Sequence, residues 1–156
     1  FEDAYFLFSV RIFDASLARS HTNPKKIYCV DHAMVRSVSS GILVNSGHLL
    51  ENLAFTALRR IHPEIYYYKT RAGHEIDFIV PSRGRSPTLV QVCESMAEPQ
   101  ARKREVAALR EAMSELGVKH GTIVTKNEAE GIVADRGSIA VVPMWRFLLN
   151  LTAPEE

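Results

Sequence analysis

Cysteine is scarce in this sequence, with only Cys29 and Cys93 in a chain of 156 residues. Both stand among apolar, strand-like neighbours, which suits buried thiols in a reducing cytoplasm better than a disulfide framework. No Cys-x-x-Cys occurs, and the six histidines lack the paired spacing of a zinc site. We therefore expect a cytoplasmic protein that relies on neither disulfides nor zinc.

Long apolar runs and an excess of one charge are also missing. No stretch is long enough to span a bilayer and no signal peptide is visible, so we expect no membrane partner. The formal net charge of +1 gives no global electrostatic argument for nucleic acid binding. A P-loop of the form Gly-x-x-x-x-Gly-Lys-Ser/Thr is absent, so we expect no ATP hydrolysis by this chain.

The size and composition of the chain indicate one globular domain. With 46% hydrophobic and 24% charged residues, 156 residues are enough for one core and too few to promise two. The chain begins without methionine and is strand-like by Tyr5, which suggests a piece of a longer protein, although processing can give the same start.

The first 45 residues predict a pair of strands followed by a linker. Aromatic and β-branched residues favour strands over 5–13 and 26–30, and Asn23-Pro24 marks a turn between them. A short helix is expected within 32–45.

From residue 46 onward, helical and strand patterns alternate. Ser46 is read as the N-cap of a helix over 46–61 that Pro63 stops. Its apolar stripe consists of Leu50, Leu53, Ala54, Ala57, Leu58 and Ile61. Strands are expected over 65–69, 75–80 and 88–93, a helix over 100–116, strands over 121–125 and 138–142, and a closing helix over 145–151. This order predicts an α/β sandwich with a mixed sheet.

Asp77 is the most informative residue, because it stands inside an apolar, β-branched run. A buried strand seldom tolerates an unpaired carboxylate, so Asp77 is read as a metal ligand, a salt-bridge partner or a catalytic group. Strict alternation places Glu75, Asp77 and Ile79 on one face of their strand. Glu51 falls at the edge of the helical stripe, from which it can reach a cleft.

Carboxylates that converge on a divalent cation are suited to phosphodiester hydrolysis. Mg²⁺ prefers hard oxygen ligands and retains waters, while a nearby ammonium offsets negative charge in the transition state. An endonuclease-like site supplies these groups as a helix acid, a strand aspartate, and then an acid and a lysine two residues apart on the next strand. This chain has Glu51, Asp77, Gln91 and Cys93 in those places. Over residues 46–126 it therefore resembles the PD-(D/E)XK nuclease superfamily with an altered third motif.

The resemblance implies a restriction-endonuclease-like α/β sandwich with a mixed central sheet, and a site where Glu51 and Asp77 hold Mg²⁺ or Mn²⁺. Gln91 takes the place of the second acid, although its amide carbonyl is a weaker ligand than a carboxylate. Cys93 cannot replace an ammonium, because a buried thiol is neutral. The lysines that can substitute are Lys69, Lys103 and Lys126, and Lys103 on the following helix is the candidate catalytic lysine.

A narrower resemblance extends over the whole chain. It is carried by Tyr5-Phe6-Leu7-Phe8, the segment 23–28, Asp31, Leu50-Glu51-Asn52, Glu75-Ile76-Asp77-Phe78 and Val142-Pro143-Met144-Trp145. In this order they are similar to the uncharacterised C-terminal domain of bacterial and archaeal AAA+ ATPases. The resemblance implies an upstream ATPase and winged-helix region, reached through residues 1–45, a nuclease-like core over 46–156, and oligomers formed through the ATPase. Many members keep Glu-x-Lys at the third motif, which this sequence lacks.

The leading functional hypothesis is a nuclease-like domain that is catalytically weakened or inactive and binds nucleic acid or docks a partner. The alternative is an active metal-dependent endonuclease that uses Glu51 and Asp77, and a third is a structural domain that sets ATPase assembly. The candidate nucleic-acid contacts are the basic residues that flank the proposed cleft: Lys69, Arg71, Arg102, Lys103 and Arg104.

Simpler interpretations of the same residues stay open. Asp77 can be ion-paired with Lys69 or Arg71, and Glu51 can be a solvated helix acid. Gln91 and Cys93 are then a satisfied amide and a core thiol. Two expectations test the site: the strands of Asp77 and Gln91 are adjacent beneath the helix 46–61, and the carboxylates of Glu51 and Asp77 share one ion or water.

Overall fold

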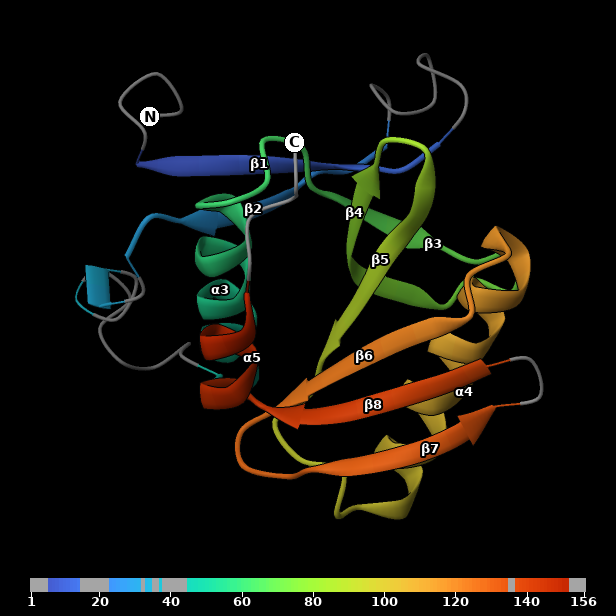
Figure 1. The fold of residues 1–156 in the computed structure, drawn as a ribbon. Coiled ribbons are helices and arrows are strands. Elements are labelled where there is room, and N and C mark those ends of the chain that lie inside the picture. Colours follow the sequence, from blue (N-terminus) through green and yellow to red (C-terminus); the bar gives the residue numbers. More distant parts are fainter. Residues whose placement is uncertain are drawn as a thin grey trace.

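The computed structural model describes residues 6–14, 23–31, 33, 34, 37, 45–134 and 137–151. Its elements, in chain order, are β1 (Leu7–Ile12), β2 (Lys26–Cys29), α3 (Ser46–Arg59), β3 (Tyr66–Lys69), β4 (Glu75–Ser82), β5 (Arg85–Val92), α4 (Pro99–Leu116), β6 (His120–Thr125), β7 (Glu130–Ala134), β8 (Gly137–Pro143) and α5 (Met144–Asn150) (Figure 1). The helix predicted within 32–45 falls largely outside the described residues. Within them, no helix is long and apolar enough to cross a membrane.

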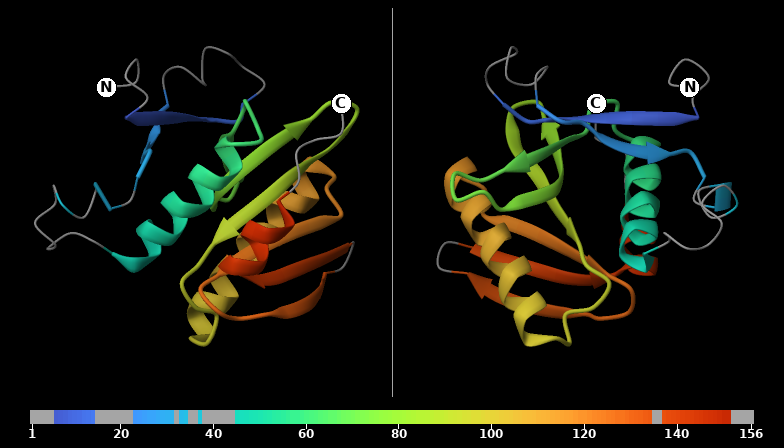
Figure 2. Two further views of the ribbon diagram at one scale, coloured as in Figure 1. Left: turned by 60° about the vertical axis from the view of Figure 1, so that its left-hand side comes forward. Right: turned by 180° about the vertical axis from the view of Figure 1, so that it is seen from behind.

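The described strands form one sheet of eight, in the order β2-β1-β3-β4-β5-β6-β8-β7. The sheet is mixed, as the sequence predicts. The pairs β1/β3, β5/β6 and β6/β8 are parallel, and the remaining neighbours are antiparallel. The strands of Asp77 and Gln91 are adjacent, with Phe78 opposite Val90, which confirms the expected pairing. Figure 2 shows the β1–β2 hairpin turned away from the plane of β6, β8 and β7, so that β2 lies beside α3.

The two faces of the sheet carry separate apolar clusters. One cluster lies under α3 and α5 and contains Phe55, Phe78 and Val90. The other lies under α4 and contains Ile79 and Leu109. Each face thus buries its own set of side chains, which is the layered packing that the alternation of helices and strands predicts.

Helix α3 begins one residue earlier than the sequence indicates. Its N-cap is Asn45, whose side-chain oxygen accepts a hydrogen bond from the Gly47 backbone N–H at 2.9 Å, while Ser46 is already helical. The helix ends at Arg59, ahead of Pro63. It buries Asn52 and Phe55, which the predicted stripe omits, because β2 packs against that side of the helix.

Strand β4 does not follow strict alternation, and this corrects the predicted faces. Its pairing with β3 shifts register: Tyr66 faces Ile79 but Tyr68 faces Ile76, so β4 carries one extra residue there. Such a bulge re-aims the side chains around it. Ile76 and Ile79 therefore pack under α4, whereas Asp77 and Phe78 both turn toward α3.

One predicted loop was too long, and one strand was not predicted. The loop expected over 81–87 is a tight turn at Arg83-Gly84, where Gly84 has φ 67°, and β5 begins at Arg85. Strand β7 was missed, because the exposed Glu130-Gly131 start gives little strand signal. The helix α4 matches expectation, with Gly117 in the left-handed C-cap conformation at φ 66°.

Candidate functional site

A pocket of about 490 Å³ opens between β2, the first turns of α3 and the start of β4. It is lined by Leu7, Lys26, Ile27, Tyr28, Cys29, Asn45, His48, Leu49, Glu51, Asn52, Glu75 and Asp77. Two of the four residues predicted for the catalytic site, Glu51 and Asp77, are therefore in the wall of one pocket. Gln91 and Lys103 are not among the residues that line it.

Lys26 stands at the centre of this pocket. Its ammonium Nζ lies 2.9 Å from Glu51 Oε1, 2.9 Å from Glu75 Oε1 and 2.8 Å from Asp77 Oδ1. One cation from β2 thus joins carboxylates from α3 and β4. The predicted convergence of Glu51 and Asp77 is present, and the group they share is an ammonium.

Glu51 is fixed in place by β2. Lys26 and Tyr28 are two residues apart on that strand, so both side chains point to the same side. The Tyr28 hydroxyl donates to Glu51 Oε1 at 2.6 Å, and its ring stacks on Phe55 with centroids 4.4 Å apart. Burial raises the pKa of the Tyr28 hydroxyl, and the charge of Glu51 adds to the rise, so Tyr28 stays a donor.

Asp77 is held from two sides. Its Oδ1 contacts Lys26, and its Oδ2 accepts the backbone N–H of Val92 at 2.8 Å. Burial raises the pKa of Asp77, the nearby charge of Glu51 raises it further, and Lys26 opposes both. For Lys26, burial lowers the pKa, but the charges of Asp77 and Glu51 outweigh this and raise it. Lys26 therefore remains an ammonium.

Gln91 does not contribute its amide to the pocket. The side-chain carbonyl accepts the backbone N–H of Asp77 at 3.1 Å, and Nε2 donates to Glu105 Oε2 at 2.8 Å. Glu105 is itself buried and accepts two hydrogen bonds from Arg104, at 2.9 and 2.6 Å. The Cys93 thiol donates to the Ser95 carbonyl at 3.0 Å, and burial raises its pKa, so the thiol stays neutral.

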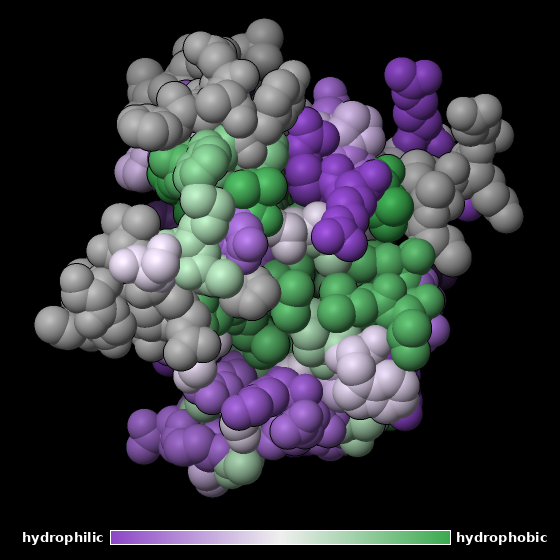
Figure 3. All heavy atoms as spheres, turned by 90° about the vertical axis from the view of Figure 1, so that its left-hand side faces the viewer, coloured by the Kyte–Doolittle hydropathy of each residue, from purple (hydrophilic) through white to green (hydrophobic). Residues whose placement is uncertain are grey.

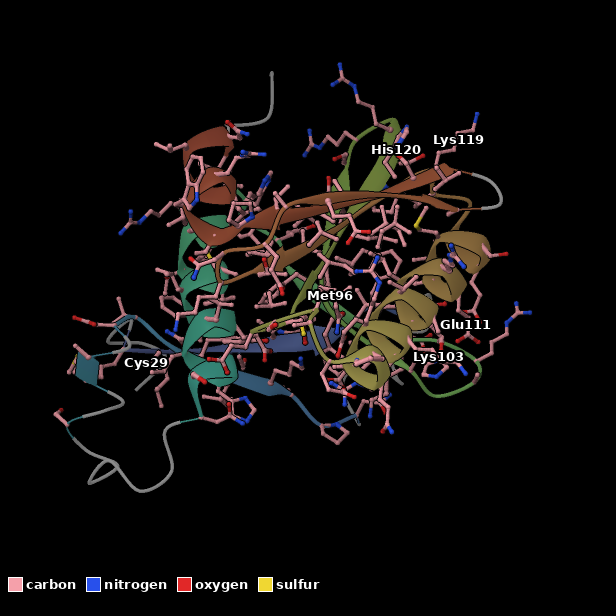
Figure 4. All side chains as sticks on the ribbon, turned by 90° about the horizontal axis from the view of Figure 1, so that it is seen from below. Cys29, Met96, Lys103, Glu111, Lys119 and His120 are labelled. Carbon is pink, nitrogen blue, oxygen red and sulfur yellow. The ribbon has the colours of Figure 1, made fainter. Side chains whose placement is uncertain are left out.

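Three of the five predicted nucleic-acid contacts are paired with acidic side chains. Lys69 lies 3.7 Å from Glu75 Oε2, Arg102 pairs with Glu130, and Arg104 pairs with Glu105. The backbone N–H of Arg71 donates to Glu115. Lys103 is exposed on α4, well separated from Cys29 in the pocket wall (Figure 4).

Sequence reasoning missed the residue that organises the site. The ion-pair partner of Asp77 is Lys26, and neither Lys69 nor Arg71 takes that role. Glu51 is also no solvated surface acid, since its side chain is 17% exposed. The available signal was the Lys-x-Tyr spacing of Lys26 and Tyr28, which puts a cation and a hydroxyl on one strand face. That Lys26 reaches Glu51 and Asp77, however, depends on how the β1–β2 hairpin is tilted, which the local sequence does not indicate.

A divalent cation does not fit the site as the residues stand. Carboxylate oxygens are the ligands that Mg²⁺ prefers, and Glu51, Glu75 and Asp77 supply them. Their point of convergence, however, is filled by the ammonium of Lys26. Across the described part of the chain, no three His, Cys, Asp or Glu side chains are grouped so as to hold a metal ion.

The comparisons with known proteins give one family, one relative by sequence and one solved structure of partly similar shape. A chain of the tetradecameric assembly of Thermococcus gammatolerans McrB AAA+ hexamers with bound McrC is similar at a TM-score of 0.45 and 12% identity, covering 63% of this chain and 28% of that one. An uncharacterized protein of Methanocaldococcus jannaschii is 32% identical over 96% of this chain. The chain spans 34% of the length of that relative. Residues 46–147 match a family described as "Domain of unknown function (DUF4143)". This chain belongs to the DUF4143 family.

Proposed function

We propose that this domain is a nuclease-like module without hydrolytic activity, and that it docks a protein partner within a longer, ATPase-bearing polypeptide. The resemblance to the C-terminal domains of AAA+ ATPases supports the presence of an ATPase in the same polypeptide. The greater length of the archaeal relative supports a longer polypeptide. The partner is then the ATPase-bearing remainder of the same polypeptide.

The loss of hydrolysis rests on Gln91. In the PD-(D/E)XK nucleases that the sequence resembles, this position supplies a second acid that faces the cation. Here the Gln91 amide is used by the Asp77 backbone and by Glu105, and it turns away from the pocket. Cys93, two residues later, is a neutral thiol bonded to the Ser95 carbonyl. Neither residue can stabilise charge on a phosphodiester in the pocket.

A protein partner suits the surface better than nucleic acid does. Three of the five candidate phosphate contacts are already ion-paired, and the pocket has three carboxylates against one ammonium. That balance repels phosphates. Apolar side chains gather on the face where α3 and α5 lie side by side (Figure 3). On α5, Trp145 and Leu149 are 54% and 75% exposed, as is common at protein interfaces.

The docking role is tested by binding between this domain and the rest of the longer polypeptide. Leu149→Ser removes an exposed apolar group from α5, and we expect it to weaken binding about tenfold or more. Val133→Ser is the matched control, because Val133 is 84% exposed on the distant strand β7. If both variants bind the rest of the polypeptide as tightly as the unmodified chain does, α5 is not part of the interface. Salt-sensitive binding of DNA at comparable affinity would point to nucleic acid instead.

One observation favours a second function, an active Mg²⁺- or Mn²⁺-dependent endonuclease. Lys26 Nζ lies 2.8 Å from Asp77, so β2 supplies an ammonium that Cys93 cannot. The assay is cleavage of plasmid DNA and single-stranded RNA with Mg²⁺ or Mn²⁺, with Asp77→Asn as the control. We expect no cleavage that depends on Asp77. Cleavage that Asp77→Asn abolishes would establish the endonuclease.

A further inference from the structure

We propose that Lys26 is the resident cation of the pocket and keeps divalent metal ions out of it. The inference deepens the proposed loss of hydrolysis by naming the group that stands where a metal would bind. The unmodified chain should therefore show no saturable binding of divalent metal ions, which can be measured without any assay of cleavage.

The donors of the Lys26 ammonium match the carboxylates around it. A lysine ammonium has three N–H donors and no acceptor. Lys26 has three carboxylate partners, at 2.8 to 2.9 Å, which is the length of a charge-assisted hydrogen bond. Each donor can therefore have an acceptor of its own, and the side chain is 20% exposed. A metal ion that enters must break all three contacts.

The backbone that carries Lys26 is held against α3. Its strand is fastened to α3 through Asn52, whose side chain accepts the Cys29 N–H at 2.8 Å and donates to the Cys29 carbonyl at 3.0 Å. Tyr28 adds a hydrogen bond to Glu51 and a ring stacked on Phe55. A tethered ammonium is present at high effective concentration, so a free cation competes against it at a disadvantage.

Lys26 offsets part of the negative charge of Glu51, Glu75 and Asp77. A second cation, Lys69, lies 3.7 Å from Glu75 Oε2. Without Lys26 the carboxylates outnumber Lys69, and their oxygens are ligands that suit Mn²⁺ and Mg²⁺. The three carboxylates are not grouped so as to hold a metal ion as they stand. A neutral side chain of similar length at position 26 should therefore let them close on a metal ion.

The experiment measures Mn²⁺ binding by calorimetry and by the paramagnetic resonance of free Mn²⁺. For the unmodified chain we expect no saturable binding. For Lys26→Met we expect saturable binding at least about tenfold tighter, and a melting temperature that rises with Mn²⁺. Lys26→Arg keeps a cation and should not bind Mn²⁺. Asp77→Asn introduced into Lys26→Met should remove the new site.

Two results would overturn the inference. One is saturable Mn²⁺ binding by the unmodified chain that Asp77→Asn abolishes. The other is a folded Lys26→Met chain that binds Mn²⁺ no more tightly than the unmodified chain. If Lys26→Met does not fold, the unmodified chain and Lys26→Arg still decide, because metal binding by either contradicts a resident ammonium. If the Mn²⁺ binding results contradict this inference and no cleavage is found, the proposed docking function still holds. Cleavage that requires Asp77 would contradict the docking function itself.

Discussion

At the scale of single residues, the site depends on where side chains from distant segments of the chain meet. Asp77 was identifiable from the sequence because a carboxylate in an apolar run needs a partner. Glu51 was identifiable from its place at the edge of a helical stripe. Lys26 was not, because basic residues beside a turn are common and nothing local says that one of them reaches α3 and β4.

Tyr28 tests the residue-scale account of how Glu51 is held. Tyr28→Phe removes the hydroxyl that donates to Glu51 Oε1 and keeps the ring that stacks on Phe55. Glu51 then loses a partner in a half-buried setting, so we expect the free energy of unfolding to fall by about 1–3 kcal/mol in urea titrations. Tyr66→Phe is the control, because Tyr66 contributes a ring contact with Phe13 that phenylalanine preserves. Equal stability of both variants would show that the Tyr28 hydroxyl does not hold Glu51.

At the scale of elements, most helices and strands followed from pattern, and the departures have local causes. The bulge in β4 comes from pairing with β3, and a single strand read alone cannot reveal its partner's register. The bulge matters for function, because it turns Asp77 toward α3. Asn45 rather than Ser46 caps α3, since either side chain suits an N-cap and only the backbone decides.

A second element-scale feature is the attachment of the β3–β4 turn to α4. Glu111 accepts from the Thr70 hydroxyl at 2.9 Å and from the Ala72 N–H at 3.3 Å, and its Oε2 lies 2.5 Å from His74 Nδ1. Glu115 accepts from the Tyr68 hydroxyl at 2.6 Å. Two glutamates one helical turn apart thus hold one hairpin turn.

We expect Glu111→Gln to loosen the β3–β4 turn and to remove the dependence of its stability on pH in the acid range. The hydrogen bond with His74 lowers the pKa of Glu111 below its ordinary value. A carboxyl whose pKa is lowered in the folded protein stabilises the fold at pH values above its ordinary pKa. This contribution is lost as the pH falls through the lowered pKa. Amide exchange at Ala72 should therefore be faster in Glu111→Gln than in the unmodified chain at neutral pH, and the difference should shrink in acid. Glu130→Gln, which affects only the Arg102 pair, is the control. Unchanged exchange at Ala72 would contradict the attachment.

At the scale of the whole molecule, each edge strand of the described sheet has backbone groups that are hydrogen-bonded by a side chain from a helix. Asn52 takes up the backbone groups of Cys29 on the outer side of β2, and Arg110 donates to the Val133 carbonyl of β7 at 2.9 Å. Exposed strand edges invite pairing with other chains, and side chains that occupy them limit this. The mixed sheet was predictable from the order of elements. The turn of the β1–β2 hairpin against α3 was not, because it depends on contacts more than twenty residues apart.

Asn52 tests how the hairpin is fastened to the rest of the molecule. Asn52→Ala leaves the buried N–H and carbonyl of Cys29 without their partners, so we expect a loss of about 2 kcal/mol or more in the free energy of unfolding. Asn150→Ala, at the exposed end of α5, should cost far less. If Asn52→Ala is as stable as Asn150→Ala, the hairpin is fastened by other contacts.

The central claim is that the pocket holds a lysine ammonium where a nuclease-like site holds a metal. Its most direct test is anomalous diffraction from crystals of the unmodified chain grown with an excess of Mn²⁺ over protein. The account predicts no manganese peak among Glu51, Glu75 and Asp77, with Lys26 Nζ in contact with all three carboxylates. A manganese peak bridging Glu51 and Asp77, with Lys26 displaced or standing beside the ion, would contradict it.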